Sequence, residues 1–155
     1  MRKNSNFINS VKTAISGIIN TFKAERNMRF HFVVGNLIIL FAYFYGLTRF
    51  EWIVLILTIT MVLFAELVNT AIEEATDTAT MEFSETAKFA KDASAGAVLL
   101  MAVASIVIGC MLFLDISKIG ATFIYIFSSP IRVIISFLIG ILDILFLIFA
   151  GKREE

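Results

Sequence analysis

Apolar and polar positions occur in long blocks along this chain, and the first block is amphipathic. From about residue 5 to 24 the apolar side chains recur with helical spacing and fall within about 120° of arc at 100° per residue. The block is too polar to cross a bilayer, which indicates a helix lying in the membrane interface. An amphipathic helix packed on other parts of the protein would have the same pattern. The apolar positions are Phe7, Ile8, Val11, Ile15, Ile18, Ile19 and Phe22.

Four later blocks are apolar enough to cross a bilayer core, which takes about 20 helical residues. Ser129 and Pro130 resemble an N-cap and a first-turn proline at the start of the last block. A further apolar stretch, residues 119–127, is too short to span. We therefore predict an all-α membrane protein with an N-terminal surface helix, three transmembrane helices and an extra C-terminal one. The spans are expected at about residues 30–48, 52–72, 93–114 and 131–150.

Composition agrees with membrane insertion. The 155 residues are 59% hydrophobic with a mean hydropathy of +0.89, whereas soluble domains are nearer half apolar. A net charge of zero gives no indication of nucleic-acid binding. The single cysteine, Cys110, lies in an apolar run and is expected to be a packing residue, and no intramolecular disulfide can form. The polar N-terminus does not resemble a signal peptide.

Lysine and arginine residues set the expected orientation. Six of them precede the first span, between Arg2 and Arg29, which predicts a cytoplasmic N-terminus. The acidic stretch 66–92 then also faces the cytoplasm. Four spans return Lys152 and Arg153 to the same side, which agrees with this orientation.

One stripe of polar residues is the candidate for chemistry. Glu66, Asn69, Glu73 and Asp77 are spaced three, four and four apart, so on a helix they share about 80° of arc. Glu66 lies about 21 Å beyond Trp52, one or two turns inside the boundary of a ~30 Å bilayer core. A carboxylate at that depth is costly and is a functional candidate. For Asp77 the solvated end of a long helix is an equal interpretation.

Carboxylates in a row, with Lys91 nearby, suit phosphoryl transfer. Magnesium takes one or two carboxylates and leaves its other positions to water and phosphate oxygens. A base must accept the proton of the attacking alcohol, and a glutamate partly withdrawn from water is well suited to that role. The P-loop and protein-kinase motifs are absent. On spacing alone, a cation transporter is an equally good interpretation.

The segment from Glu66 to Asp77, Glu66-Leu-Val-Asn69-Thr-Ala-Ile-Glu73-Glu-Ala-Thr-Asp77, resembles a family signature. The pattern E-x-x-N-[ST]-A-[IV]-E-x-x-x-D is typical of the small prokaryotic diacylglycerol kinases and undecaprenol kinases. Ala90-Lys91-Asp92 and a run of small residues follow it, as in the family. Upstream, Glu25-Arg-Asn-Met-Arg29 and His31 resemble the family segment after the surface helix. The resemblance covers roughly residues 5 to 114.

This resemblance implies a lipid kinase domain over residues 1–114, with 115–155 as an extension beyond the family plan. Enzymes of the family phosphorylate a membrane lipid alcohol with ATP and Mg²⁺, as homotrimers. Carried over by position, Glu66 would accept the proton of the bound lipid hydroxyl, and Glu25 and Glu73 would hold magnesium. Asn69 and Asp77 would support the site. The implied ATP contacts are Glu25, Glu73, Lys91, Asp92, Glu82, Phe83 and Ser84.

Some alternatives stay open. Glu25 and Arg29 are four residues apart, and by spacing alone they would form an ordinary surface pair. The Glu25–His31 segment looks more like undecaprenol kinases of Gram-positive bacteria, so undecaprenol is the first expected substrate and diacylglycerol the second. A divalent-cation carrier and a non-catalytic membrane subunit are the competing classes.

The extension contains one unexplained charge. Asp143 falls inside the predicted fourth span. It would pair with Arg132 of a neighbouring chain, face a polar cavity, or be protonated.

Overall fold

The computed structural model describes residues 7–79 and 84–151. Over these two ranges the chain forms helices joined by short connections, without strands. The helices are α1 (Phe7–Ala24), α2 (Arg26–Tyr45), α3 (Arg49–Ala79), α4 (Glu85–Leu112), α5 (Ile116–Phe127) and α6 (Pro130–Phe149).

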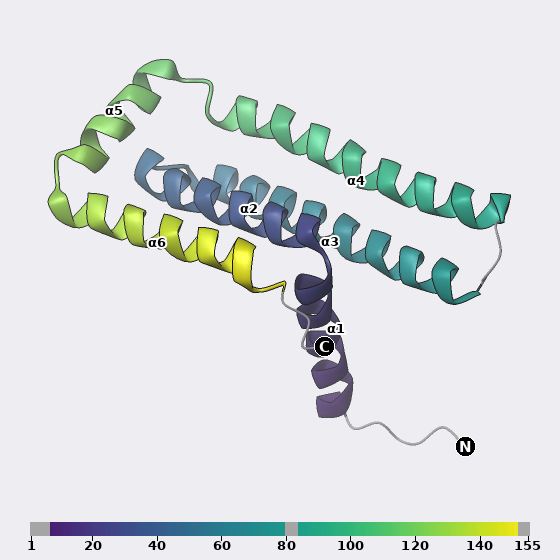
Figure 1. Ribbon diagram of the computed structural model, residues 1–155. Coiled ribbons are helices and arrows are strands. Elements are labelled where there is room, and N and C mark those ends of the chain that lie inside the picture. The colour runs from purple at the N-terminus through teal and green to yellow at the C-terminus, as the bar shows by residue number, and fades with distance from the viewer. Residues whose placement is uncertain (1–6, 80–83, 152–155) are drawn as a thin grey trace.

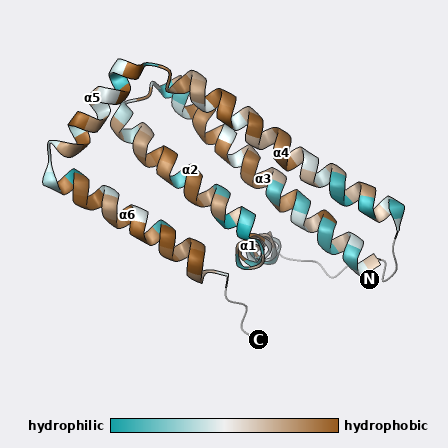
Figure 2. Ribbon diagram, turned by 45° about the horizontal axis from the view of Figure 1, so that its top comes forward, coloured by the Kyte–Doolittle hydropathy of each residue, from teal (hydrophilic) through white to brown (hydrophobic). Residues whose placement is uncertain are grey.

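Four of the helices lie side by side in one layer (Figures 1 and 2). The order across the layer is α6, α2, α3, α4, and the neighbours in this order are packed on one another. α5 crosses one end of the layer and connects α4 to α6, while α1 projects from the other end at a steep angle (Figure 1). The chain therefore has a closed end at α5 and an open end where α2 begins.

α2, α3, α4 and α6 are each long and apolar enough to cross a membrane. This confirms the predicted all-α membrane fold with four candidate spans. α3 and α4 are longer than the spans expected at 52–72 and 93–114, because both helices continue through the polar segments that flank them. These segments are rich in alanine, glutamate and lysine, which favour helix. At 31 residues α3 is about 46 Å long, so it extends beyond a ~30 Å bilayer core.

Local sequence fixes where these helices begin and end. Gly46 ends α2 in the left-handed conformation (φ 72°), and its N–H donates to the carbonyl of Ala42 at 3.0 Å. Glu51 accepts hydrogen bonds at 2.7 Å from both the backbone N–H and the hydroxyl of Thr48, which caps the start of α3. Ser84 is the N-cap of α4 and accepts from the N–H of Ala87.

Hydrophobic packing is concentrated at the closed end. Ala42, Tyr45, Leu47 and Leu55 form the buried cluster there, with α4 and α5 residues packed against it. Figure 2 shows the opposite distribution at the open end, where α2, α3 and α4 carry hydrophilic residues. The closed end thus anchors the helices, and α1 packs against α2 and α3 at the other end.

The C-terminal extension forms two helices and contacts the first span. α6 begins at Ser129–Pro130, as predicted, and the short apolar stretch forms α5. Asp143 is 6% exposed, and its partner is Asn36 of α2, a residue that sequence reasoning did not single out. Within the chain, the Arg132 guanidinium lies 3.6 Å from the Tyr125 ring centroid and donates to Ser128.

Candidate functional site

The polar stripe of α3, Glu66 to Asp77, lies in the half of the helix that leads to the open end of the layer. Glu66 is the most deeply placed member and is 2% exposed. It lies about 26 Å along α3 from Arg49, close to the far boundary of a ~30 Å bilayer core. Asn69 and Glu73 are half-buried, and Asp77 is exposed. The stripe therefore runs from the membrane interior into the aqueous side.

Glu66 is surrounded by groups from two elements. The side chain of Asn27, in the first turn of α2, lies close enough to interact with its carboxylate. The negative charges of Glu25 and Glu73 also act on it. Three carboxylates thus lie near enough to repel one another electrostatically, which favours binding of a cation near them.

A chain of hydrogen bonds connects α3 to α4 beside these carboxylates. The amide of Asn69 donates to Glu73 Oε1 at 2.9 Å, and the hydroxyl of Ser94 is 2.7 Å from Asn69 Oδ1. Ser94 Oγ also lies 2.9 Å from the carbonyl oxygen of Lys91. This arrangement fixes which side of the Asn69 amide faces Glu73. Sequence reasoning saw Ser94 only as one of a run of small residues, because its partner is 25 residues away.

Lys91 also lies on this face of α4. Its ammonium forms an ion pair with Asp77 Oδ1 at 2.6 Å. Both side chains are partly exposed, so the ammonium is accessible from the aqueous side. Asp92 is exposed as well, and Ser84 serves as the cap of α4. Glu82 and Phe83 lie outside the described residues.

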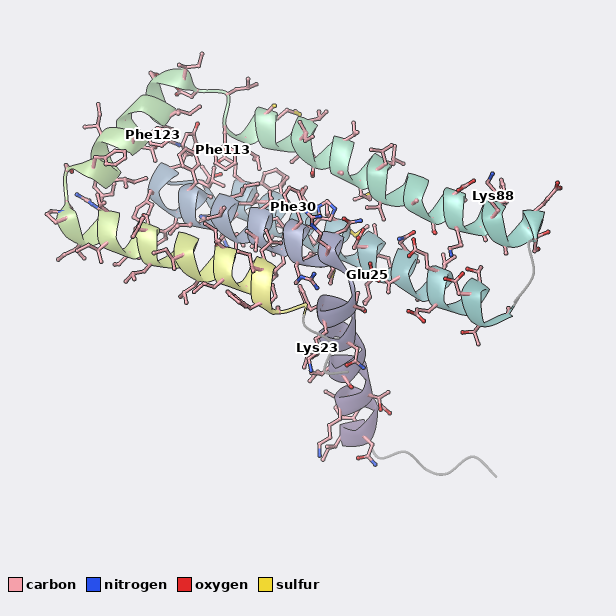
Figure 3. All side chains as sticks on the ribbon, viewed as in Figure 1. Lys23, Glu25, Phe30, Lys88, Phe113 and Phe123 are labelled. Atoms are coloured by element: carbon pink, nitrogen blue, oxygen red, sulfur yellow. The ribbon has the colours of Figure 1, made fainter. Side chains whose placement is uncertain are left out.

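Glu25 occupies the junction between α1 and α2. Figure 3 shows it at this hinge. Its backbone is extended (φ −100°, ψ 121°), and its side chain makes no capping hydrogen bond to α2. The expected surface pair with Arg29 is wrong. Arg29 is buried and its guanidinium donates to the carbonyls of Phe22 and Lys23 at 2.8 and 3.1 Å.

The donor set fits magnesium bound together with phosphate. Among residues 7–79 and 84–151 no group of three or more histidine, cysteine, aspartate or glutamate residues is arranged to hold a metal ion. Magnesium in phosphoryl-transfer sites needs only one or two carboxylates, since phosphate and water supply the other ligands. Glu25 and Glu73 supply that number, from different elements, beside Glu66.

An apolar groove descends from this site between α3 and α4. Its volume is about 220 Å³. Asn69 and Ser94 line it together with apolar side chains that include Phe64, Val68 and Met101. A hydrocarbon chain lying in the groove would have its polar end near the hydrogen-bonded chain of Ser94, Asn69 and Glu73.

Comparison with known proteins points to one family. The model of a family described as prokaryotic diacylglycerol kinase matches residues 12–113. The undecaprenol kinase of Bacillus subtilis (strain 168) is 39% identical over 108 residues, which cover 70% of this chain and 88% of that protein. The matched region ends before α5, so α5 and α6 lie outside the family model.

Two diacylglycerol kinases are also similar. That of Synechocystis sp. (strain ATCC 27184 / PCC 6803 / Kazusa) is 39% identical over 119 residues, covering 72% of this chain and 68% of that protein. That of Haemophilus influenzae (strain ATCC 51907 / DSM 11121 / KW20 / Rd) is 32% identical over 110 residues, which cover 70% of this chain and 93% of that protein. No solved structure matches the chain significantly.

Proposed function

This chain belongs to the prokaryotic diacylglycerol kinase family, and we propose that it transfers the γ-phosphoryl group of ATP to undecaprenol. Membership makes it a membrane lipid kinase that takes ATP and a lipid alcohol as substrates. The cation-carrier and non-catalytic interpretations, which carboxylate spacing alone left open, are therefore no longer favoured.

The observation that carries the proposal is the position of Glu66. It is a buried carboxylate near the expected membrane boundary, with Glu25 and Glu73 acting on it from the aqueous side. A lipid hydroxyl arrives from the membrane and ATP arrives from water, so their reaction needs a site at this depth. The apolar groove beside Asn69 suits the hydrocarbon part of the lipid.

In the proposed reaction each polar side chain of the site has one role. Glu66 accepts the proton of the lipid hydroxyl, and the hydroxyl oxygen attacks the γ-phosphorus of ATP. The bond from that phosphorus to the oxygen of the β-phosphate breaks, and ADP leaves. Lys91, oriented by Asp77, compensates negative charge on the phosphates. Asp92 and Ser84 are the remaining proposed ATP contacts that fall among the described residues.

Glu25 and Glu73 would hold Mg²⁺, which neutralises phosphate charge when bound. Asn69 orients Glu73 by donating to its carboxylate. Glu25 makes no capping bond that would compete with a metal. Chelation by EDTA should abolish phosphoryl transfer, and added Mg²⁺ should restore it. Undiminished activity in EDTA would contradict a metal role for these two carboxylates.

Undecaprenol is the preferred acceptor for two reasons. The Glu25–His31 segment resembles that of undecaprenol kinases, and the Bacillus subtilis undecaprenol kinase matches this chain over most of its own length. Diacylglycerol is the second candidate, because relatives named diacylglycerol kinase are 39% and 32% identical.

The test is transfer of radiolabelled phosphate from ATP, by purified protein in mixed micelles, to undecaprenol and diacylglycerol side by side. Glu66→Gln should lose the activity, since an amide cannot accept the proton. Glu74→Gln is the matched control, because Glu74 is an exposed carboxylate on the same helix. Labelling of diacylglycerol alone would refute the substrate assignment. Unchanged labelling by Glu66→Gln would refute the base.

We also propose a homotrimer in a prokaryotic plasma membrane, with the N-terminus and the site in the cytoplasm. The family resemblance supports the trimer, and the lysines and arginines before α2 support the orientation. Mass measurement of the purified protein in detergent tests the first, and a monomeric mass would contradict it. A C-terminal fusion to green fluorescent protein tests the second, since it fluoresces when the C-terminus is cytoplasmic.

A further inference from the structure

Helix α6 runs antiparallel to α2 and is fixed to it inside the apolar layer by a polar pair. The amide of Asn36 donates to both carboxylate oxygens of Asp143, at 2.8 and 3.0 Å. Asp143 is 6% exposed, and both helices are otherwise apolar around it. Sliding α6 along α2 would leave both polar groups without partners, so the pair selects one register.

One turn closer to the hinge, an aromatic cluster joins three helices. Phe32 of α2 and Phe146 of α6 have ring centroids 5.5 Å apart. Phe22, near the end of α1, lies 5.2 Å from the first ring and 5.9 Å from the second, edge-on to both. Edge-to-face pairs at these distances are favourable. α6 therefore contacts the surface helix as well as α2.

Beyond the cluster, the turn after α6 packs against Arg29, which connects α2 to the last turn of α1 by hydrogen bonds. Arg29 of α2 donates to the carbonyls of Phe22 and Lys23, which are in the last turn of α1 and lack partners within that helix. Gly151 lies directly on its guanidinium. A Cβ atom at Gly151 would come 2.5 Å from Arg29 Nη2 and 2.7 Å from Cζ, so a side chain there would displace the guanidinium.

These three contacts step along α2 towards Glu25, which lies between the end of α1 and the start of α2. We propose that α6 is a clamp that fixes the angle between α1 and α2 and thereby positions the Glu25 carboxylate. The proposal rests on the proposed function, in which Glu25 is a metal ligand. Asp143, Phe146 and Gly151 are then positioning residues, and the C-terminal extension contributes to the site without touching substrate.

The first test measures the hinge itself by hydrogen exchange, read by mass spectrometry on the full-length protein in micelles without nucleotide. Gly151→Ala should raise the exchange rate of the amides between Lys23 and Arg29 by about fivefold or more, since local opening becomes easier. Gly140→Ala, inside α6, is the control, because a Cβ there would meet nothing within 4 Å. Unchanged exchange in Gly151→Ala would overturn the clamp.

A second pair of variants separates positioning from general loss of fold. Asp143→Leu should have the same effect on the hinge as Gly151→Ala. Exchanging the two partners, Asn36→Asp with Asp143→Asn, restores an amide–carboxylate pair and should return exchange to the wild-type rate. Failure of this exchanged variant to recover, while its helix content is normal, would contradict the register role of the pair.

The link to Glu25 is tested by binding of Mn²⁺ in the presence of ADP, followed by the electron paramagnetic resonance signal of the free ion. Gly151→Ala should weaken binding by about tenfold, as loss of a group that orients a metal ligand does. Faster exchange with unchanged Mn²⁺ binding would overturn the positioning of Glu25. Neither measurement needs lipid phosphorylation, so failure of the proposed function would be seen separately, as absence of labelled lipid from wild-type protein.

Discussion

Removing the hydroxyl of Ser94 tests whether the hydrogen-bonded chain beside the carboxylates matters for catalysis. Ser94 is 6% exposed and lies 2.7 Å from the Asn69 carbonyl oxygen. Asn69 in turn donates to Glu73 at 2.9 Å. In Ser94→Ala the Asn69 carbonyl has no donor, and its amide is free to rotate away from Glu73. The prediction concerns the position of a proposed magnesium ligand that Ser94 does not itself touch.

The expected loss of activity in Ser94→Ala follows from the one hydrogen bond that the substitution removes. Leaving one buried acceptor without a partner costs about 1–3 kcal/mol. If this cost appears in the transition state, kcat/KM falls about 5- to 150-fold, at 1.36 kcal/mol for each factor of ten. The loss should be largest at low Mg²⁺, because a bound metal can itself hold Glu73 in place.

The assay is lipid phosphorylation in mixed micelles at a series of Mg²⁺ concentrations. Ser94→Thr keeps a hydroxyl and should retain most of the activity. Ser105→Ala is the matched control, since Ser105 lies on the same helix and donates only locally, to the Ala102 carbonyl at 2.8 Å. Activity of Ser94→Ala within twofold of wild type at every Mg²⁺ concentration would refute the reasoning.

Lys91→Ala should raise the KM for ATP about tenfold or more, because a charged hydrogen bond to the phosphates is lost. Steady-state kinetics checks this KM increase. Lys88→Ala is the control, because Lys88 is an exposed lysine on the same helix. Equal KM values for ATP in the two variants would contradict the prediction. Gly35→Ala should destabilise the packing of α2 on α3 by about 1–3 kcal/mol, since its Cβ would lie 2.9 Å from Ile59 Cγ2. Thermal unfolding in detergent checks this against Gly109→Ala, where a Cβ meets nothing within 4 Å. Ile59→Leu removes the Cγ2 methyl and should restore the stability of the Gly35→Ala protein. An unaltered unfolding temperature in Gly35→Ala alone would contradict the prediction, because it would show that the interface between α2 and α3 relaxes around the new methyl.

Local geometry was readable from the sequence because it depends on residues a few positions apart. The stripe from Glu66 to Asp77 is one face of a helix by spacing alone, and the start of α6 followed from Ser129–Pro130. Four spans followed from the length and hydropathy of four segments. The resemblance to a family also came from a contiguous motif. None of these inferences required knowing which helices are neighbours.

Contacts between distant segments could not be read in this way. Asn36 and Asp143 are 107 residues apart, and Asn69 and Ser94 are 25 apart. In a membrane the lipid-facing and protein-facing sides of a helix are both apolar, so hydrophobic periodicity does not identify the packed face. A single asparagine or aspartate in such a helix marks that a partner is needed, but not which helix supplies it.

The sequence by itself thus determined the class of fold, the number of spans and the stripe that carries Glu66. The tertiary structure decided that α6 packs on α2, and that Arg29 caps α1 where spacing suggested a surface pair with Glu25. The physical reason is the distance along the sequence over which each effect acts: helix formation and bilayer insertion depend on short stretches of chain. Pairing of buried polar groups depends on which helices meet, and that is fixed only when the whole layer assembles.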